Sequence, residues 1–490
     1  MRARFVCFLI FCATAFAQSS QPSLTIYNQD FAVVRQELPL DLQSGVNHVN
    51  VDDITMHMEP DSVILRDPSD KRNLNVLEQN YRADPVSQAS LLSLYEGRTI
   101  DFEQPDHTIV KGKIIRSGYV RPDYFNVNGY NQGYQPEEPI IEIARQVRFG
   151  LPGLPIFPDL AAETILKPRL EWTLATDKAG KFPAEFSYVT GGMSWQADYN
   201  IVAPDKGDIV DIVGWITMDN RTGKTFENAR IKLIAGDVNK LRSNPQFAMK
   251  VALAADSVNG AMAPPVTEKA FDEYHLYTLQ RTTTLRDRET KQVEFIHASG
   301  VVAKQLYIYD GARIDSNRYN GWTWENIRND HSYGTESNTK VWVMREFVNS
   351  EANHLGMPLP KGRVRFYRSN DGQTEFTGEN TIDHTPRDEK VRIYTGNAFD
   401  LTGERKRTNY TVETRQNTAT ESFEIRVRNH KKEPVQIRVV EHLYRGSNWE
   451  ITSKSDDYQK KDSQTIEFPV TVAPDAEKVI TYTARYTWGS

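Results

Sequence analysis

Short runs in which apolar and polar residues alternate are the feature that most limits the folds open to this chain. The pattern opens with Leu24, Ile26, Phe31 and Val33, and it recurs in stretches such as TIVKGKIIRSG and ESFEIRVRN. Because successive side chains of a β-strand point to opposite faces, a period of two predicts half-buried strands. Short runs of this kind, bounded by Gly, Pro, Asn or Asp, predict an all-β, multi-domain β-sandwich protein.

One short helix is the expected exception. The stretch PVSQASLLSLY, Pro85–Tyr95, offers Asp84 as an N-cap and places Pro85 at the first helical position, where proline is tolerated. We expect at most a few such short helices in the whole chain.

Three segments interrupt the alternation and are expected to form long loops: 118–139, 243–269 and 315–340. From about Leu401 the strands restart at a density typical of an immunoglobulin-like or fibronectin-like sandwich. We therefore expect a signal peptide at 1–17, an N-terminal β-rich domain at 18–185, a central β domain at 186–400 and a C-terminal β-sandwich at 401–490.

The first residues, MRARFVCFLIFCATAFA, have the parts of a secretory signal peptide. Arg2 and Arg4 give a positive start, Phe5–Phe16 is an apolar core, and Ala15 and Ala17 give the small-x-small pattern of a cleavage site. A membrane anchor is disfavoured because it takes about 20 apolar residues. We expect export with cleavage near Ala17, a periplasmic or extracellular mature chain, and no transmembrane segment in it.

Both cysteines, Cys7 and Cys12, lie in the expected signal peptide. The mature chain would therefore have no disulfides, no thiolate metal ligands and no cysteine nucleophile. The formal net charge of the full sequence is −6, and loss of Arg2 and Arg4 would make it two units more negative. This excess of negative charge argues against nucleic acid as a partner.

The stretch DNRTGKTFENA contains Gly223-Lys224-Thr225, the end of a phosphate-binding loop. The first glycine of that motif would fall on residue 218, which is Met218. The sequence alternates on both sides, so a hairpin is the better interpretation. Asn220 and Gly223 would then serve the turn, and Lys224 would be a solvated tip.

No complete catalytic or metal-binding motif is present. The histidines form no H-E-x-x-H or H-x-H pattern, and there is no G-x-S-x-G. Ser337 and Lys340 spell S-x-x-K, but the lysine leads into an alternating run that predicts a strand. We therefore expect no catalytic residues, no metal ligands and no cofactors. A calcium-stabilised adhesion module is a third alternative for the function, because oxygen-bearing side chains lie near glycines.

Aromatic residues in the loop at 315–340 are the candidate ligand-binding residues. Tyr319, Trp322, Trp324 and Tyr333 lie among Asn, Asp, Gly and Ser. Exposed Trp and Tyr in polar loops can stack on sugar rings or on the side chains of a partner. The alternative is that these rings fold down and cover a sheet edge, since Trp is usually mostly buried.

Several longer phrases resemble one known family. They are LTIYNQDFAVVRQELPLDLQSGVNHV, YVTGGMSWQADYNIV with Trp195 and Tyr199, DNRTGKTFENARIKLIAGDVN, LPKGRVRFYR and TGENTIDHTPRDEKVRIYTGNAFDL. Together they are similar to domain-of-unknown-function family 4139, whose members include mucoidy-inhibitor A-like exported proteins. The resemblance implies an all-β architecture with a sandwich-like C-terminal part, and it implies no catalytic residues. The long coiled coil that many members carry has no counterpart here, because no heptad pattern is sustained.

The expected export, the strand pattern and the lack of a catalytic motif lead to one expectation of function. We expect an exported, non-enzymatic binding or scaffold protein of the cell envelope, whose partner is an envelope protein or a glycan. The alternative is an envelope-associated hydrolase that acts on glycans or peptides through acidic residues from distant segments. The sequence does not determine the oligomeric state.

Overall fold

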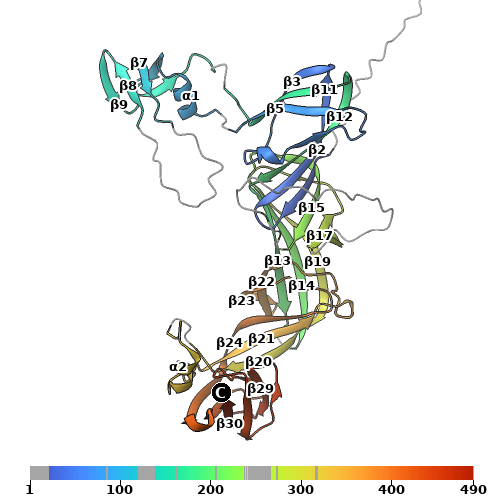
Figure 1. Ribbon diagram of the computed structural model, residues 1–490, viewed down its shortest axis with the longest axis vertical. Helices are drawn as coiled ribbons and strands as arrows, with labels where there is room; N and C mark the ends of the chain where they lie inside the picture. Colours follow the sequence, from blue (N-terminus) through green and yellow to red (C-terminus); the bar gives the residue numbers. More distant parts are fainter. Residues whose placement is uncertain are drawn as a thin grey trace, which may run out of the picture. The chain divides into compact units, whose positions relative to one another are not determined.

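The structure is a computed structural model that describes residues 21–83, 86–119, 138–160, 164–204, 207–236, 238, 240, 266–271, 274–314 and 318–488. The expected signal peptide and most of the expected loops at 118–139 and 243–269 lie outside these residues. The described chain consists of many β-strands and two short α-helices, which confirms the all-β expectation (Figure 1).

The chain divides into two compact units. Unit 1 contains residues 1–195 and 217–292, and unit 2 contains residues 196–216 and 293–490. The expected domain boundaries at 185/186 and 400/401 fall inside two long strands, β12 (Gly180–Gly191) and β24 (Lys390–Glu413).

Unit 1 contains an eight-stranded sheet and a three-stranded sheet. The eight-stranded sheet has the order β16-β17-β15-β1-β2-β12-β4, with β18 paired to β15. Its strands, besides β12, are β1 (Ser23–Tyr27), β2 (Phe31–Leu42), β4 (Ile64–Arg66), β15 (Phe226–Ala235), β16 (Val266–Phe271), β17 (Tyr274–Leu279) and β18 (Thr283–Leu285). The smaller sheet has the order β3-β11-β5, with β3 (Gly45–Asp52), β11 (Arg169–Thr176) and β5 (Leu74–Arg82). The rings of Trp172 on β11 and Phe186 on β12 meet edge to face at 5.3 Å and join the two sheets through the core.

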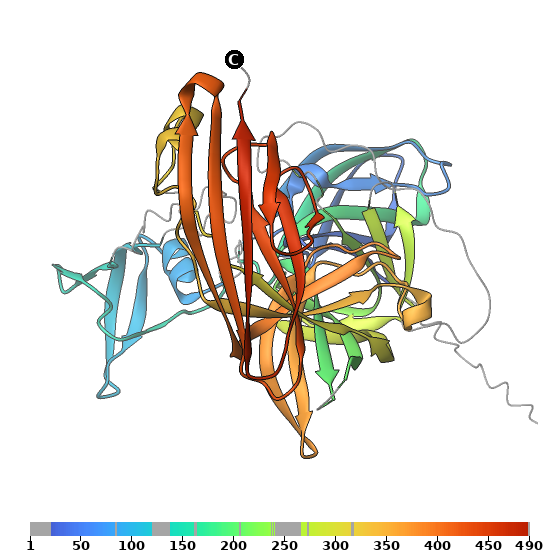
Figure 2. The ribbon, with the colours of Figure 1, turned by 90° about the horizontal axis from the view of Figure 1, so that it is seen from below.

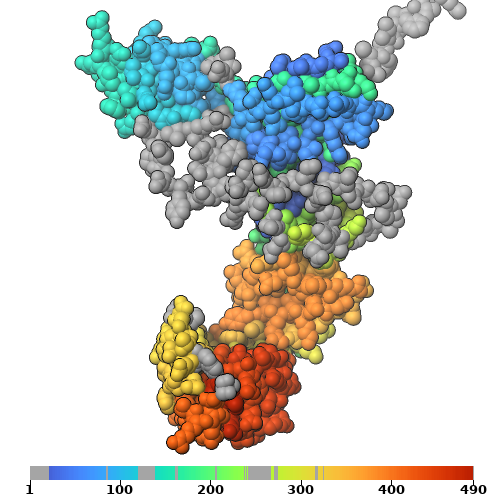
Figure 3. Space-filling model, in the orientation of Figure 1, coloured from blue at the N-terminus to red at the C-terminus, as the bar shows by residue number. Residues whose placement is uncertain are grey.

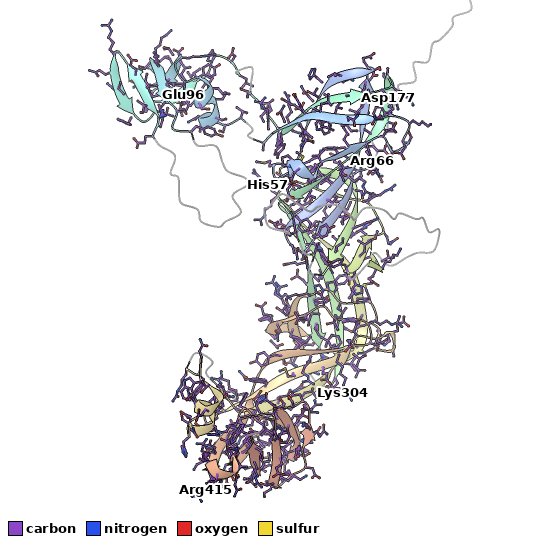
Figure 4. All side chains as sticks on the ribbon, viewed as in Figure 1. His57, Arg66, Glu96, Asp177, Lys304 and Arg415 are labelled. Carbon is purple, nitrogen blue, oxygen red and sulfur yellow. The ribbon has the colours of Figure 1, made fainter. Side chains whose placement is uncertain are left out.

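Residues 86–119 and 138–160 of unit 1 form a small subdomain, here called the α1 subdomain. It contains α1 (Gln88–Leu94), β6 (Thr99–Glu103), β7 (Ile109–Arg116), β8 (Ile140–Ile143), β9 (Gln146–Phe149) and β10 (Leu154–Ile156). Its core gathers Tyr95, Phe102 and Ile141 around α1. Glu96, labelled in Figure 4, accepts hydrogen bonds from the Ser117 N–H and hydroxyl at the end of β7.

The expected helix is present, but its N-cap is not Asp84. The N-cap is Ser87, whose hydroxyl accepts from the Ser90 N–H, while the Ser90 hydroxyl accepts from the Ser87 N–H. This reciprocal pair satisfies two N–H groups at the start of the helix. It therefore fixes the start of α1 later in the chain than the proline signal predicted.

Unit 2 contains most of a five-stranded sheet and all of a nine-stranded sheet. The first has the order β19-β14-β13-β22-β23, with β13 (Met193–Ala203), β14 (Ile209–Asn220), β19 (Glu289–Val302), β22 (Gly362–Asn370) and β23 (Gln373–Ile382). The second has the order β27-β30-β25-β24-β21-β20-β26-β29-β28. Its strands, besides β24, are β20 (Lys304–Asp310), β21 (Lys340–Val348), β25 (Thr418–Asn429), β26 (Val435–His442), β27 (Trp449–Lys454), β28 (Gln459–Lys460), β29 (Thr465–Val472) and β30 (Ala476–Thr487). The other helical segments are α2 (Trp324–Asn329), η1 (Pro60–Ser62), η2 (Glu351–Asn353) and η3 (Thr414–Gln416).

The nine-stranded sheet folds over on itself, so that β29 packs against β25 and β30, and its long strands lie side by side in Figure 2. The buried residues alternate along β25 as the sequence predicts: Phe423, Ile425 and Val427 face the core. Burial of each such side chain stabilises the fold by about 1.5–3 kcal/mol. The C-terminal part is therefore sandwich-like, as expected.

Three parallel strand pairs share one plan that no sequence repeat revealed. The pairs are β1–β15, β13–β22 and β20–β26. The later strand of each pair follows a fully buried asparagine: Asn220 before β15, Asn349 before β22 and Asn429 before β26. The side-chain amide nitrogen of each asparagine lies within 3.5 Å of three main-chain carbonyl oxygens. In each pair, one asparagine thus ties the loop before the later strand to a segment that is distant in sequence.

The stretch DNRTGKTFENA is a turn, but the expected hairpin is wrong. Strands β14 and β15, on either side of it, belong to different sheets. Within the turn, the Asn220 side-chain amide donates to the carbonyls of residues 285 and 286. Gly223 has a φ of 79°, and a Cβ there would lie 2.5 Å from the Met56 side chain. Lys224 is not a solvated tip either, since its Nζ donates to the Asp53 carbonyl at 2.6 Å and burial lowers its pKa.

Candidate functional site

The expected loop at 315–340 forms an ordered insertion between β20 and β21, described from residue 318. Helix α2 lies within it, and the Thr323 hydroxyl accepts from the Asn326 N–H as the N-cap. Ala312 and Ser337 form an isolated antiparallel bridge at the base of the insertion. In Figure 3 this segment, coloured yellow, lies against the orange and red C-terminal strands of the same unit. We call residues 318–338 the insertion.

Three arginines of the nine-stranded sheet and its loops hold the insertion through its main chain. Arg405 and Arg407 lie on β24, and Arg445 follows β26. The Arg405 guanidinium donates to the Gly334 carbonyl at 2.7 Å, and the Arg407 guanidinium donates to the His331 carbonyl. These contacts fix the C-terminal half of the insertion.

Arg445 makes the largest share of these contacts. Its guanidinium donates to the carbonyls of Asp330 and Tyr333, both at 3.0 Å, and to that of Ile327. The Ile327 carbonyl lies in the last turn of α2, where a cation is favourable. The Tyr410 hydroxyl donates to the Arg328 carbonyl in the same turn.

Two buried glutamates neutralise most of this charge. Glu441 accepts from Arg405 at 2.9 Å and from the Tyr482 hydroxyl at 2.6 Å. Glu421 lies 3.2 Å from Arg407 and 2.7 Å from Arg445. Burial, followed by the negative charge of Glu441, raises the pKa of Tyr482 well above its usual value. Three cations therefore face two carboxylates, and main-chain carbonyls of the insertion accept further hydrogen bonds from the guanidinium groups.

The predicted ligand-binding residues have different surroundings. Tyr319 and Tyr333 are each 8% exposed, and their rings meet at 4.9 Å in an edge-to-face contact. Trp322 is half-buried with its ring 4.9 Å from that of Tyr319. Trp324 lies in α2, but its side chain is outside the described residues. The two tyrosine rings pack against each other within the insertion, and a binding role for the four residues stays a prediction.

Sequence reasoning missed exposed aromatic residues elsewhere in unit 2. Phe399 on β24 is 96% exposed, and Phe376 on the edge strand β23 is 56% exposed with its ring 5.8 Å from that of Tyr367. Phe399 lies where the pairing of β24 with β21 shifts register, so its side chain has left the alternating pattern. A phenylalanine in an alternating run predicts core, and only the bulge would have indicated otherwise.

One hydroxyl, imidazole and carboxylate lie in series at the ends of β20, β26 and β29. His442 Nε2 lies 2.9 Å from Asp310 Oδ2, and its Nδ1 lies 3.4 Å from Thr465 Oγ1. The hydrogen bond with Asp310 raises the pKa of His442, although burial opposes the shift. This order of groups can hold a proton on the imidazole, and carboxylate, imidazole and hydroxyl in series are the groups of a hydrolytic triad.

Two further findings concern the described residues alone. Within the described ranges, no three His, Cys, Asp or Glu side chains gather as a metal site. No helix in the same ranges is long and apolar enough to cross a membrane.

Comparisons with known proteins give a family and no closer relative. No curated protein and no solved structure matches the chain. The model of a family described as a domain of unknown function, DUF4139, matches residues 184–490, which is more than half of the chain. The match begins inside β12 and includes the insertion, the three arginines and all three buried asparagines. This chain therefore belongs to the DUF4139 family.

Proposed function

We propose that this chain is an exported, non-enzymatic binding or scaffold protein of the cell envelope, and that the insertion forms part of its contact surface. The observation that supports the proposal most directly is the attachment of the insertion by Arg405, Arg407 and Arg445. A surface loop ordered before a partner arrives loses less conformational entropy on binding. Binding residues are commonly carried on loops that a rigid scaffold positions.

Burial of the arginines that hold the insertion costs free energy, and this cost favours a functional reason for the attachment. Burial of charged groups is expensive unless they are paired and hydrogen-bonded. A simple connection from β20 to β21 would need no buried guanidinium, because a short polar loop satisfies its own main chain in water. The half-buried Trp322 keeps part of its large apolar side chain accessible, which suits either a protein or a glycan partner.

Substitution of Trp322 tests the contact surface. Trp322→Ala is compared with Asn320→Ala, which removes an exposed polar side chain of the same insertion. Each tagged full-length protein is used to capture partners from an extract of the envelope of the source cell. We expect the captured partner to be lost with Trp322→Ala and retained with Asn320→Ala. Equal capture by both variants, with melting curves like that of the wild type, would remove Trp322 from the contact surface.

Export is tested separately. We expect the protein recovered from the periplasm or medium to begin at Gln18, as N-terminal sequencing or intact mass would show. Recovery of the chain in the cytoplasm with residues 1–17 retained would contradict export.

A second candidate function is the hydrolysis of glycans or peptides, and the series Asp310–His442–Thr465 favours it. In that reaction His442 would take the proton of the Thr465 hydroxyl, which would be the nucleophile. Thr465→Val and His442→Gln should then both abolish release of product from fluorogenic peptide and glycan substrates. Absence of turnover by the wild-type protein across these substrates would leave binding as the function.

A further inference from the structure

The sheet of the α1 subdomain has two edge strands of different character. Its order is β10-β6-β7-β8-β9, so β10 and β9 lie at the edges. Strand β10 contains Pro155, which lacks an N–H and prevents the addition of a regular strand there. All four residues of β9 are exposed, and none of them is proline. The β9 edge is therefore the one that can accept another strand.

The main-chain groups of β9 alternate in direction, and the register shows which of them point outward. Strands β8 and β9 are joined through Ala144 and Arg145, with φ values of 50° and 66°, as in a type I′ hairpin turn. Gln146 is therefore hydrogen-bonded to β8, and so is every second residue after it. The Gly150 N–H donates to the Pro139 carbonyl at 2.8 Å, which agrees with this register. The N–H and C=O groups of Val147 and Phe149 consequently point away from β8.

The side chains of β9 give this edge a chemical pattern. Val147 and Phe149 are 61% and 71% exposed, and they lie on the face opposite to the buried Ile141. Arg148 is the cross-strand partner of Ile141, so its side chain lies on the same face of the sheet as Ile141. No ion pair joins Arg148 to a carboxylate of the described residues. An incoming strand would thus meet two apolar side chains on one face and a guanidinium on the other.

A second copy of this chain fits the pattern poorly. A two-fold pairing with Val147 opposite Phe149 of the second copy would bring the two Arg148 side chains opposite each other, which is unfavourable. A pairing with the two Val147 residues opposite each other would place Gln146 opposite Arg148 and supply no countercharge. Strand β10 of a second copy offers no carboxylate and lacks one N–H.

We propose that β9 is a docking edge for an extended segment of another protein, in which an acidic residue lies between two apolar residues. The main chain of that segment would pair with the outward groups of Val147 and Phe149. Its apolar residues would lie opposite Val147 and Phe149, and its carboxylate would lie opposite Arg148. This edge lies outside the residues matched to the family, so the proposal is independent of the insertion.

Two matched synthetic peptides test the proposal with the full-length protein. Both alternate valine and threonine and have soluble ends, and they differ at one central position, which is Glu in one and Lys in the other. We expect the Glu peptide to bind the wild-type protein about fivefold more tightly than the Lys peptide, as measured by fluorescence anisotropy. Hydrogen exchange should show that the Glu peptide protects the amides of Val147 and Phe149.

Three variants locate the contact. Val147→Pro removes an N–H that the β8 ladder does not use, and it should weaken binding of the Glu peptide at least about tenfold. Arg148→Glu should reverse the preference in favour of the Lys peptide without affecting the core. Ile109→Ala, which changes an exposed apolar residue on β7, serves as the control and should leave binding unchanged.

Several outcomes would overturn the proposal. The wild-type protein could bind neither peptide, or Val147→Pro and Arg148→Glu could bind the Glu peptide as the wild type does. Self-association of the wild type in sedimentation, lost in Val147→Pro, would identify a second copy as the occupant instead. Melting curves of each variant show whether the full chain is folded, and Arg148→Glu keeps the test valid should Val147→Pro disturb the hairpin.

Discussion

Arg445 and Glu421 form an ion pair inside unit 2, with Arg445 Nε 2.7 Å from Glu421 Oε1 and both side chains at most 5% exposed. The other two nitrogens of the same guanidinium bind carbonyls of the insertion. One side chain therefore connects the core of the nine-stranded sheet to the insertion. Its removal should affect the insertion before it affects the sheet.

Arg445→Met is expected to loosen the insertion. The variant loses charge-assisted hydrogen bonds worth about 1.5–3 kcal/mol each, so local opening becomes at least about tenfold more frequent. Limited digestion with trypsin should then cleave after Arg328 faster, and mass spectrometry of the fragments would show the site. Arg415→Met, at the exposed β24–β25 turn labelled in Figure 4, is the control. Equal cleavage after Arg328 in both variants would contradict the role of Arg445.

The buried pair of Arg405 and Glu441 should show strong non-additivity. Arg405→Met alone leaves Glu441 buried without its partner and should reduce the free energy of unfolding by about 3–5 kcal/mol. The double variant Arg405→Met/Glu441→Leu should be more stable than Arg405→Met alone, because no buried charge is left unpaired. Urea unfolding measures both values. Lys432→Met, which breaks the exposed pair with Asp475, should cost less than about 1 kcal/mol.

Asn220 and Asn429 should be equivalent in their effect on stability. Replacement of either by Ala removes the buried amide from three main-chain carbonyls and should cost about 3 kcal/mol. Asn75→Ala, on an exposed position of β5, should change stability by less than about 0.5 kcal/mol. A loss at Asn220 or Asn429 no greater than that at Asn75 would mean that these contacts contribute nothing net.

The contact between His442 and Asp310 should make stability depend on pH. The raised pKa of His442 means that its contribution is fully present below the unfolded value of 6.5 and is lost as pH rises through the folded value. The difference in free energy of unfolding between wild type and Asp310→Asn should therefore be larger near about pH 5.5 than near about pH 9. A difference that is independent of pH, or that grows toward alkaline pH, would show that His442 is not stabilised by this carboxylate.

The strands were predictable because their signal is local. In β25 the buried Phe423, Ile425 and Val427 alternate with charged residues, and a period of two needs no tertiary information. The helix was predicted in the right place for the same reason. Its start was predicted wrongly, because a proline signal competes with a serine capping box and only hydrogen-bond geometry selects between them.

In a strand with charged residues on both faces, the sequence could not show which face is buried. In GERKRTN, Arg405 and Arg407 alternate with Glu404 and Lys406, so both faces of the strand are charged. The structure buries the arginine face because Glu441, Glu421 and the carbonyls of the insertion are available there. Those partners are distant in sequence, and burial of a charge depends entirely on its partners.

The sequence by itself determined the strand-rich character of the chain, its turn residues and its resemblance to the DUF4139 family, because each rests on a local pattern or a local phrase. Only the tertiary structure decided which sheet each strand joins, as β14 and β15 illustrate, and which charges are buried. It also decided that Lys224 is enclosed and that β9 is an edge strand among the described residues. The physical reason is that strand pairing and burial depend on contacts between residues far apart in the chain, and a period-two pattern does not specify its partner.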